Sequence, residues 1–200
     1  MSSKGDLTRQ NIIEKAMRLF GLKGYYRTSL GDIAEATNLT KGGLYGHFQS
    51  KEEIWNATYE ECSRIWQGIV LEGVKDIDDP LERLQQVIEN SMKRYLGAGV
   101  FEGGCILFNS LVEFSRESPD VSNRILRGFA GFSRLLQSWL QEAERKGMLK
   151  DGLDIPAIAN FIVISLSGAG PLYASSKDPI VWKQTMSQLK LYIDHLRKVE

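Results

Sequence analysis

TSLGDIAEATNLTKGGLYGHFQSKEEIW, residues 28–55, is the stretch that decides the fold of this chain. Its apolar residues are spaced as in helices, yet Gly42, Gly43 and Gly46 fall together where one of those helices is expected. Each glycine inside a helix costs about 1 kcal/mol relative to alanine. Glycines at these positions therefore need a reason other than helix stability.

Helix-capping residues divide this stretch into short elements. Thr28 or Ser29 is suited to begin a helix, and Asn38 to end it, because asparagine tolerates the positive φ of a tight turn. Thr40 caps a further, very short helix that continues to Phe48. Two short helices joined by a turn, with another helix before them, predict a helix-turn-helix of the three-helix kind.

Longer helices are expected on both sides of the motif. The first has Asp6 or Thr8 as its predicted cap, and its apolar stripe consists of Ile12, Ile13, Ala16, Leu19 and Phe20. Ser50 and Glu53 form a predicted capping box for a fourth helix over residues 51–75.

Helical periodicity continues to the carboxy terminus, and no segment shows the alternation of period two that is typical of strands. The fold class is therefore predicted to be all-α, with about nine helices. The remaining helices are expected over residues 81–96, 105–116, 121–146, 155–174 and 178–198.

Charge is unevenly distributed, although the formal net charge is zero. Residues 1–52 carry eight Lys/Arg against five Asp/Glu, a charge of +3, which leaves −3 on residues 53–200. A basic end on an acidic body is expected of a protein that meets a polyanion at one end only.

Two lysines stand at predicted helix starts, Lys41 and Lys51, where the helix dipole disfavours a cation. A DNA phosphate bound between the backbone N–H groups and the ammonium would make these positions favourable. Hydroxyl groups nearby add donors, from Thr28, Ser29, Thr40 and Tyr45. We expect this segment to bind phosphates; the alternative is that both lysines are only solvated, with Glu52 and Glu53 offsetting Lys51.

Residues 28–55 resemble the DNA-binding domain of TetR-type transcriptional regulators, and the whole chain is similar to them in length and helical plan. The resemblance lies in IAEA at 33–36 and in Thr40, Gly42, Leu44, Tyr45, His47, Phe48 and Lys51. Asn38 replaces the usual turn glycine. Gly46 stands where a larger residue is usual, which removes one possible DNA contact.

This resemblance implies a DNA-binding domain over residues 1–52 and an effector-binding and dimerisation domain over residues 53–200. The third helix would lie in the major groove of a near-palindromic double-stranded operator. Base edges or nearby backbone would meet Lys41, Gly42, Gly43 and His47, and phosphates would meet Thr28, Ser29, Thr40, Tyr45 and Lys51. A structural role for His47 is the alternative.

Two apolar seams near the carboxy terminus predict a homodimer. Trp182, Met186, Leu189, Ile193 and Leu196 are spaced 4, 3, 4, 3, as in coiled-coil packing. The helix before them, which carries Ile158 and Ile162, is apolar around most of its circumference and needs partners on both sides. We expect a four-helix bundle about a two-fold axis; the alternative is that both seams pack within one chain.

The resemblance also implies a pocket for a small apolar or amphipathic effector among the fifth to eighth helices. Candidate lining residues are aromatic side chains and a polar series on the sixth helix: Trp66, Phe101, Phe108, Phe132, Trp139 and Phe161, with Cys105, Asn109 and Glu113. Buried polar groups need partners, here a ligand or else arginine side chains and backbone. For each aromatic residue, ordinary core packing is the alternative.

EGGCILFNSLVEF, residues 102–114, is similar to a segment in a TetR subgroup that includes the electrophile-responsive repressor NemR. Cys105 at a helix start would have a lowered pKa if the helix end stabilised its thiolate, and it would then be reactive. No Lys or Arg lies within four residues of it. The other interpretation is therefore a small buried hydrophobic residue.

The composition argues against other compartments. Cys62 and Cys105 are too few and too far apart for a disulfide framework or a zinc site, which favours a reducing cytoplasm. The polar start MSSKGDLTRQ lacks the apolar core of a signal peptide. Residues 155–176 are free of charge and long enough to span a bilayer, but they contain two prolines, so we predict a buried helix and no membrane partner.

Catalysis is not expected, because the two histidines, His47 and His195, lie at opposite ends of the chain with no convergent acid, base and nucleophile. We predict no metal and no cofactor. The prediction is a homodimeric repressor that a small molecule releases from DNA. A helical ligand-binding protein or enzyme with an incidental basic end is the competing class, and an activator of similar architecture is also open.

Overall fold

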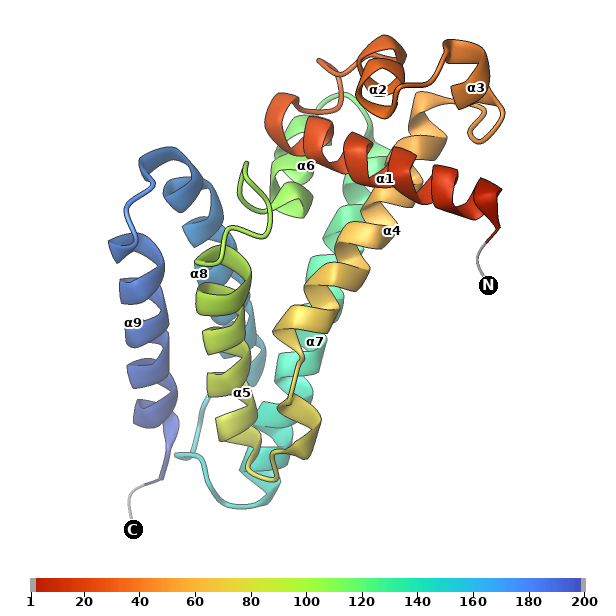
Figure 1. Ribbon diagram of the computed structural model, residues 1–200. Coiled ribbons are helices and arrows are strands. Elements are labelled where there is room, and N and C mark those ends of the chain that lie inside the picture. Colours follow the sequence, from red (N-terminus) through yellow and green to blue (C-terminus); the bar gives the residue numbers. More distant parts are fainter. Residues whose placement is uncertain (1–2, 199–200) are drawn as a thin grey trace.

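The computed structural model describes residues 3–198, and within them the chain is all-helical, with nine α-helices and no β-sheet. Figure 1 shows α1–α3 at one end of an elongated molecule, with α4 running from them into a body formed by the remaining helices. The predicted fold class is confirmed. The helices are α1 Lys4–Lys23, α2 Leu30–Thr37, α3 Lys41–Tyr45, α4 Lys51–Val70, α5 Pro80–Glu89, α6 Ile106–Phe114, α7 Pro119–Arg145, α8 Ile155–Ser176 and α9 Ile180–Leu196.

The caps around the helix-turn-helix follow the sequence. Ser29 caps α2, and the Asp32 carboxylate closes a capping box by accepting the Ser29 N–H at 2.7 Å. Asn38 ends α2 in the left-handed region with φ at 55°, as predicted. Thr40 caps α3 by accepting the Gly43 N–H at 3.0 Å.

The predicted cap of α1 is wrong. The helix begins earlier, because Ser3 is the N-cap, and Asp6 closes the capping box by accepting the Ser3 N–H at 2.9 Å. Thr8, the other predicted cap, lies inside the helix and donates its hydroxyl to the Lys4 carbonyl at 3.0 Å.

The fourth helix begins at Lys51 with Ser50 as its cap, as predicted, but its capping box and its end differ from prediction. Ser50 accepts the Glu53 N–H at 3.0 Å, but the Glu53 carboxylate accepts the Gln49 N–H instead of closing the box. The helix ends at Val70 rather than near Lys75, where a 3-10 turn, η1 (Val74–Asp76), follows.

The fifth predicted helix is broken by a change of helix type. α5 ends at Glu89, and a π-helical turn, η2 (Asn90–Leu96), follows it. The wide turn is visible in the Gly97 N–H, which donates to the Met92 carbonyl five residues back at 2.7 Å. Such turns occur mostly as single units, often at functional sites, and apolar spacing does not predict them.

Two apolar cores hold these helices together. One lies at the amino-terminal end and combines α1–α4 with Ile106 and Phe114 of α6 and Ile125 of α7. The other joins the lower part of α4 with α5, η2, α7, α8 and α9. The first core therefore crosses position 52, and the domain boundary there remains a prediction.

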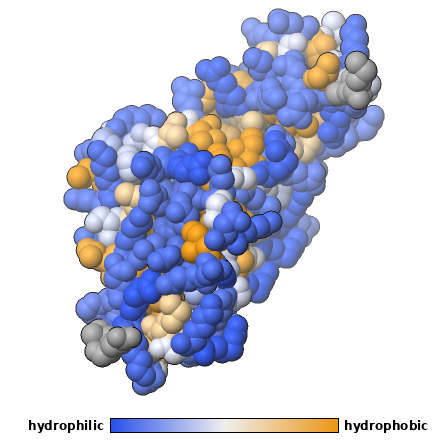
Figure 2. Space-filling view, turned by 60° about the horizontal axis from the view of Figure 1, so that its bottom comes forward, coloured by the Kyte–Doolittle hydropathy of each residue, from blue (hydrophilic) through white to orange (hydrophobic). Residues whose placement is uncertain are grey.

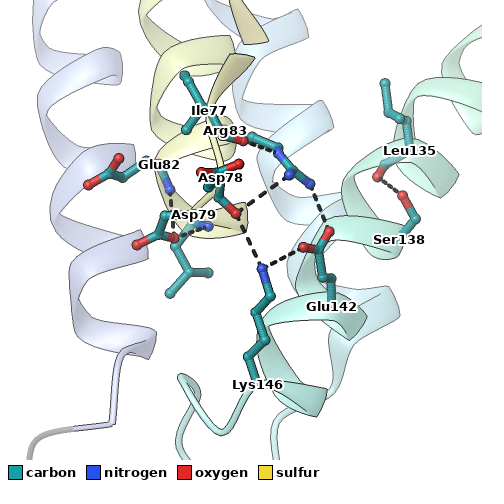
Figure 3. Close-up of polar contacts among 10 residues, drawn as sticks. Ile77, Asp78, Asp79, Glu82, Arg83, Leu135, Ser138, Glu142 and Lys146 are labelled. Carbon is teal, nitrogen blue, oxygen red and sulfur yellow. Dashed lines mark hydrogen bonds and ion pairs between the residues drawn. The ribbon is translucent and has the colours of Figure 1, made fainter. Parts of the chain in front are cut away.

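At the end of the body far from α1–α3, charged groups fasten the start of α5 to α7, as Figure 3 shows. The Arg83 guanidinium donates to the Glu142 carboxylate at 2.7 Å and to the Ile77 carbonyl at 2.6 Å. Lys146 pairs with the same carboxylate at 2.8 Å and donates to the Asp78 carbonyl at 3.3 Å. This arrangement fixes the turn after η1 relative to α7.

α8 is the only helix among the described residues that is long and apolar enough to cross a membrane by length and composition. One face of it packs against α7 and α9 within the chain. On the side of the molecule seen in Figure 2, apolar groups are separate and most of the surface is hydrophilic. A core helix passes the same length test, so α8 does not indicate a membrane protein.

Candidate nucleic-acid interface and ligand cavity

α3 presents its polar side to solvent and is anchored by two apolar side chains. Leu44 and Phe48 are almost fully buried in the amino-terminal core, as predicted. Lys41, Gly42 and Tyr45 are exposed. A helix this short is not stable by propensity alone, so its position depends on the two anchors.

The glycines of α3 differ in what surrounds them. A Cβ built at Gly42 would lie 3.8 Å from its nearest neighbour, the Thr40 hydroxyl oxygen, and would be tolerated. At Gly46, the residue that ends α3, a Cβ would lie 3.3 Å from the Gly43 carbonyl oxygen. That oxygen belongs to the same helical turn, and Gly46 has an ordinary helical φ of −67°, so the contact does not by itself require a glycine there.

The hydroxyl groups of the predicted interface fall into two sets. Ser29, Thr40 and Tyr45 are exposed on the same end of the molecule as α3. Thr28 is completely buried, and its hydroxyl donates to the Gly24 carbonyl at 2.7 Å. The predicted phosphate contact of Thr28 is therefore wrong for this conformation, because its side chain belongs to the core.

Lys51 is also placed differently from prediction. Its ammonium donates to the Tyr25 and Thr28 carbonyls, both at 3.0 Å, and lies 4.1 Å from the centre of the Tyr25 ring. Partial burial lowers the pKa of Lys51. Two of its donors thus satisfy carbonyls of the turn between α1 and α2, so Lys51 positions that turn, and its phosphate contact stays a prediction.

Glu113 of α6 holds the same turn from the other side. Its carboxylate accepts the backbone N–H groups of Tyr25 and Tyr26 at 2.8 and 2.9 Å. Gly24, with φ at 83°, leaves room for it, since a Cβ there would lie 2.7 Å from a Glu113 oxygen. The predicted role of Glu113 as a ligand contact is wrong, because its carboxylate is occupied by the turn.

Aromatic rings complete this joint between the amino-terminal helices and the body. The Phe114 ring lies 4.9 Å from the rings of both Tyr25 and Trp55, and 5.6 Å from that of Tyr26. The Tyr26 hydroxyl also lies 3.1 Å from the Ser118 hydroxyl. α6 is therefore bound to the turn between α1 and α2 by charge and by apolar contact.

A cavity of about 340 Å³ lies in the body between α4, η2, α6, α7 and α8. Its volume falls within the range of small-molecule sites, about 300–1,000 Å³. Of the predicted ligand residues, Trp66, Cys105 and Phe132 line it. The sequence analysis missed other lining side chains with aromatic or polar groups: Tyr59, Ser63, Gln67, Ser91, Tyr95, Phe129 and Ser167.

The other predicted ligand residues do not line this cavity. Phe101 lines a second hollow beside α1, and Trp139 packs against the core of the body. Phe108 packs edge-on against Phe129. Asn109 and Phe161 contact other parts of the chain.

Asn109 donates its side-chain amide to the Gly103 carbonyl at 2.8 Å, which fixes the loop before α6. Phe161 is 49% exposed and packs against Tyr192 on the outer side of α8. The period of a helix shows which residues share a face, but not whether that face meets a cavity, the core or solvent.

The two thiols are poor candidates for redox sensing. Burial raises the pKa of the Cys105 thiol, and the Tyr95 hydroxyl lies 3.8 Å from its sulfur. Burial also raises the pKa of the Cys62 thiol. Because the thiolate is the reactive form, raised pKa values make both cysteines less reactive, and sensing by Cys105 is not supported.

Most of the predicted dimer residues pack inside the chain. Five of them have at most 6% of their surface exposed: Ile158, Ile162, Leu189, Ile193 and Leu196. Trp182 and Met186 are partly buried against the same core. The seam spacing identified a packing face correctly, but its partners are helices of the same chain.

The opposite face of α8 and α9 is apolar and exposed. Ile164 and Leu172 of α8 are 69% and 64% exposed, and Leu191 of α9 is 57% exposed. With Phe161, these residues form an outer apolar face that apolar spacing does not distinguish from the buried seam.

Known proteins match both parts of the chain. One family model, described as bacterial regulatory proteins of the tetR family, matches residues 12–58, and another, a tetracyclin repressor-like C-terminal domain, matches residues 80–189. The HTH-type transcriptional repressor DhaR of Mycobacterium sp. (strain GP1) is 28% identical over 162 residues, which cover 80% of this chain and 79% of DhaR.

A second relative is the probable acrEF/envCD operon repressor of Escherichia coli (strain K12), 25% identical over 80% of this chain and 73% of that protein. The solved structure of a TetR-family transcriptional regulator from Cytophaga hutchinsonii superposes with a TM-score of 0.87 at 25% identity, over 100% of both chains. None of these matches singles out the NemR-like subgroup. The chain belongs to the tetR family of bacterial regulatory proteins and is a DNA-binding transcriptional regulator with a ligand-binding carboxy-terminal domain, not an enzyme.

Proposed function

We propose that this regulator is a cytoplasmic homodimeric repressor that leaves a near-palindromic operator when a small apolar or amphipathic molecule enters the cavity. The observation that carries the proposal is the course of α4. Its first turn holds Lys51 against the turn between α1 and α2, and its later turns carry Tyr59, Ser63 and Trp66 to the cavity wall. A ligand that shifts α4 therefore also shifts the support of α3.

α6 offers a second connection between the two sites. Cys105 and Leu107 at its start line the cavity, and Glu113 near its end binds the turn between α1 and α2. A ligand changes operator affinity only if it binds one arrangement of these helices better than the other. α4 and α6 together are the elements through which that preference would act.

The DNA contacts of this proposal come from the exposed side of α3 and its caps. Lys41, Gly42, Gly43, Tyr45 and His47 would face the major groove or adjacent backbone. Ser29 and Thr40 would contact phosphates. Thr28 and Lys51 support these contacts from within the protein, as described above.

The proposed homodimer uses the outer apolar face of α8 and α9. An exposed apolar surface of this kind marks an interaction site. A two-fold axis there would pair like faces and would place two copies of α3 on the two halves of an operator. The curated relatives described above are named as repressors, which favours repression over activation.

A mobility-shift assay with the intergenic DNA beside the gene, at two salt concentrations, tests the proposal. Lys41→Ala should weaken binding. It should also reduce the slope of log affinity against log salt concentration by about 1 for each subunit that loses a phosphate contact. Lys75→Ala in η1, a lysine that is exposed on the body, is the matched control and should leave binding unchanged. Absence of any specific shift with upstream DNA would refute the repressor proposal.

A further inference from the structure

The walls of the cavity in the body carry no charge. Among the described residues that line it, none is Asp, Glu, Lys, Arg or His. Burial raises the pKa of the Tyr95 hydroxyl, and that of the Cys105 thiol beside it, because the surroundings disfavour the ionised forms. A ligand with a formal charge would meet the same penalty, since a buried charge needs an opposite charge or several hydrogen bonds.

One buried hydroxyl in this wall, that of Ser91, lacks a hydrogen-bond partner. Ser91 is only 5% exposed, and its Oγ makes no hydrogen bond with any described residue. Two other hydroxyls of the lining have partners, because Ser63 donates to the Tyr59 carbonyl at 2.8 Å and the Tyr95 hydroxyl donates to the Cys105 sulfur at 3.8 Å. Nearly all buried polar groups are hydrogen-bonded, so an orphan at a cavity wall points to a ligand.

The π-helical turn brings Ser91 to the cavity. Asn90, at its start, is fixed by its side-chain amide, which donates to the Val70 and Glu72 carbonyls at 3.1 and 3.0 Å. The wide turn that follows brings Ser91, Met92, Tyr95 and Leu96 all to the cavity. Asn90 thereby fixes the start of the turn that carries Ser91.

Other parts of the cavity wall are aromatic. Trp66 and Phe132 meet edge to face with ring centres 4.8 Å apart, and Phe129 lies one helical turn before Phe132 on α7. Aromatic rings prefer such tilted or offset contacts with another ring. Their arrangement favours a flat ring system as the apolar part of the ligand.

We propose that the cavity binds an uncharged aromatic molecule whose hydroxyl or carbonyl group forms a hydrogen bond with the Ser91 hydroxyl. This inference rests on the proposed function, since it names the effector class of the same cavity. A two-ring compound is well within a volume of about 340 Å³. Ser91 supplies a buried polar anchor, and the aromatic walls supply the apolar contact.

Three probes with the same two-ring system test the apolar contact, the hydrogen bond and the exclusion of charge separately: naphthalene, 1-naphthol and 1-naphthoate. Calorimetric titration of the full chain should show the tightest binding for 1-naphthol, about fivefold tighter than naphthalene, as expected for one hydrogen bond. The naphthoate anion should not bind measurably, because the walls offer it no cation.

Ser91→Ala tests the anchor directly, and Ser63→Ala is the matched control, because its hydroxyl lines the same cavity but already has a partner. The ratio of the affinities for naphthol and naphthalene should fall to about one in Ser91→Ala and stay unchanged in Ser63→Ala. Comparing this ratio between variants cancels differences in probe solubility. Should Ser91→Ala fail to fold, the three probes with the unmodified chain still decide between the outcomes.

The proposal is overturned if naphthoate binds as well as naphthol, if the preference survives in Ser91→Ala, or if none of the probes binds. A mobility shift in the presence of 1-naphthol separates this result from the proposed function. Binding of naphthol that depends on Ser91 but leaves the operator complex intact would refute ligand release while supporting the ligand class. Loss of all specific DNA binding would refute the repressor proposal and leave the titration result standing.

Discussion

Replacing Glu113 with alanine removes the carboxylate that holds the turn between α1 and α2. In the native structure two backbone N–H groups, of Tyr25 and Tyr26, donate to it at 2.8 and 2.9 Å. Hydrogen bonds to a charged group contribute about 1.5–3 kcal/mol each when buried. Because one of the two contacts is exposed and water can replace it, we expect Glu113→Ala to lower the free energy of unfolding by about 2 kcal/mol.

For a chain of this size, about 2 kcal/mol corresponds to a fall in Tm of about 4–8 °C. Circular dichroism at a fixed protein concentration measures it, since Tm depends on concentration if the chain is a dimer. Glu113→Gln keeps one oxygen acceptor and should give an intermediate fall. The exposed Glu117, one turn further on, provides the control, and Glu117→Ala should change stability by less than about 0.5 kcal/mol.

Operator affinity gives a second measurement with the same variants. If the turn positions the helix-turn-helix, Glu113→Ala should also weaken the specific mobility shift at temperatures where the protein is folded. Equal Tm values for Glu113→Ala and Glu117→Ala would refute the idea that this carboxylate holds the turn.

Three further predictions concern other parts of the chain. Asn38→Val should lower the free energy of unfolding in chemical denaturation by about 1–2 kcal/mol, because a β-branched residue is strained at φ of 55°; an unchanged midpoint would contradict this. Ile164→Glu should convert a dimer into a monomer in sedimentation velocity, whereas Gln141→Glu, exposed on α7, should not; a dimer that survives excludes the outer face as its interface. Hydrogen bonds from Ser29, then the pairing with Lys23, hold the pKa of Asp32 well below its usual range, so Asp32→Asn should lower Tm at neutral pH, with the difference from the unmodified chain shrinking as the pH falls below about 4. A difference that does not depend on pH would mean that the ionised carboxylate is not responsible.

Local signals in the sequence are sufficient for the helices and for the helix-turn-helix. Capping residues and apolar spacing act within one or two turns, so Ser29, Asn38 and Thr40 can be assigned without knowledge of distant residues. The position of Leu44 follows for the same reason, since its face is defined by α3 itself. The predicted helix ends at Tyr45 rather than at Phe48, although Phe48 is buried as expected.

Such local signals do not predict contacts between distant segments. The place of Lys51 at a helix start predicts a phosphate contact, yet carbonyls of a turn 23–26 residues earlier take its donors. Glu113 shares a face with Cys105, which predicts a pocket residue, yet its carboxylate is bound 87 and 88 residues away. The buried seam of α9 has the spacing of a dimer interface, and spacing does not tell a helix of the same chain from one of a second copy.

The core shared by α1–α4 with Ile106, Phe114 and Ile125 has a consequence for protein engineering. A fragment that ends after α4 would leave apolar surface of α1 and α4 open to water. Its helix-turn-helix, α2 and α3, would also lose the support of α6. A chimeric regulator that takes its DNA specificity from another family member should therefore take α6 and the start of α7 from it together with the first four helices. All residues of the amino-terminal core then come from the same protein.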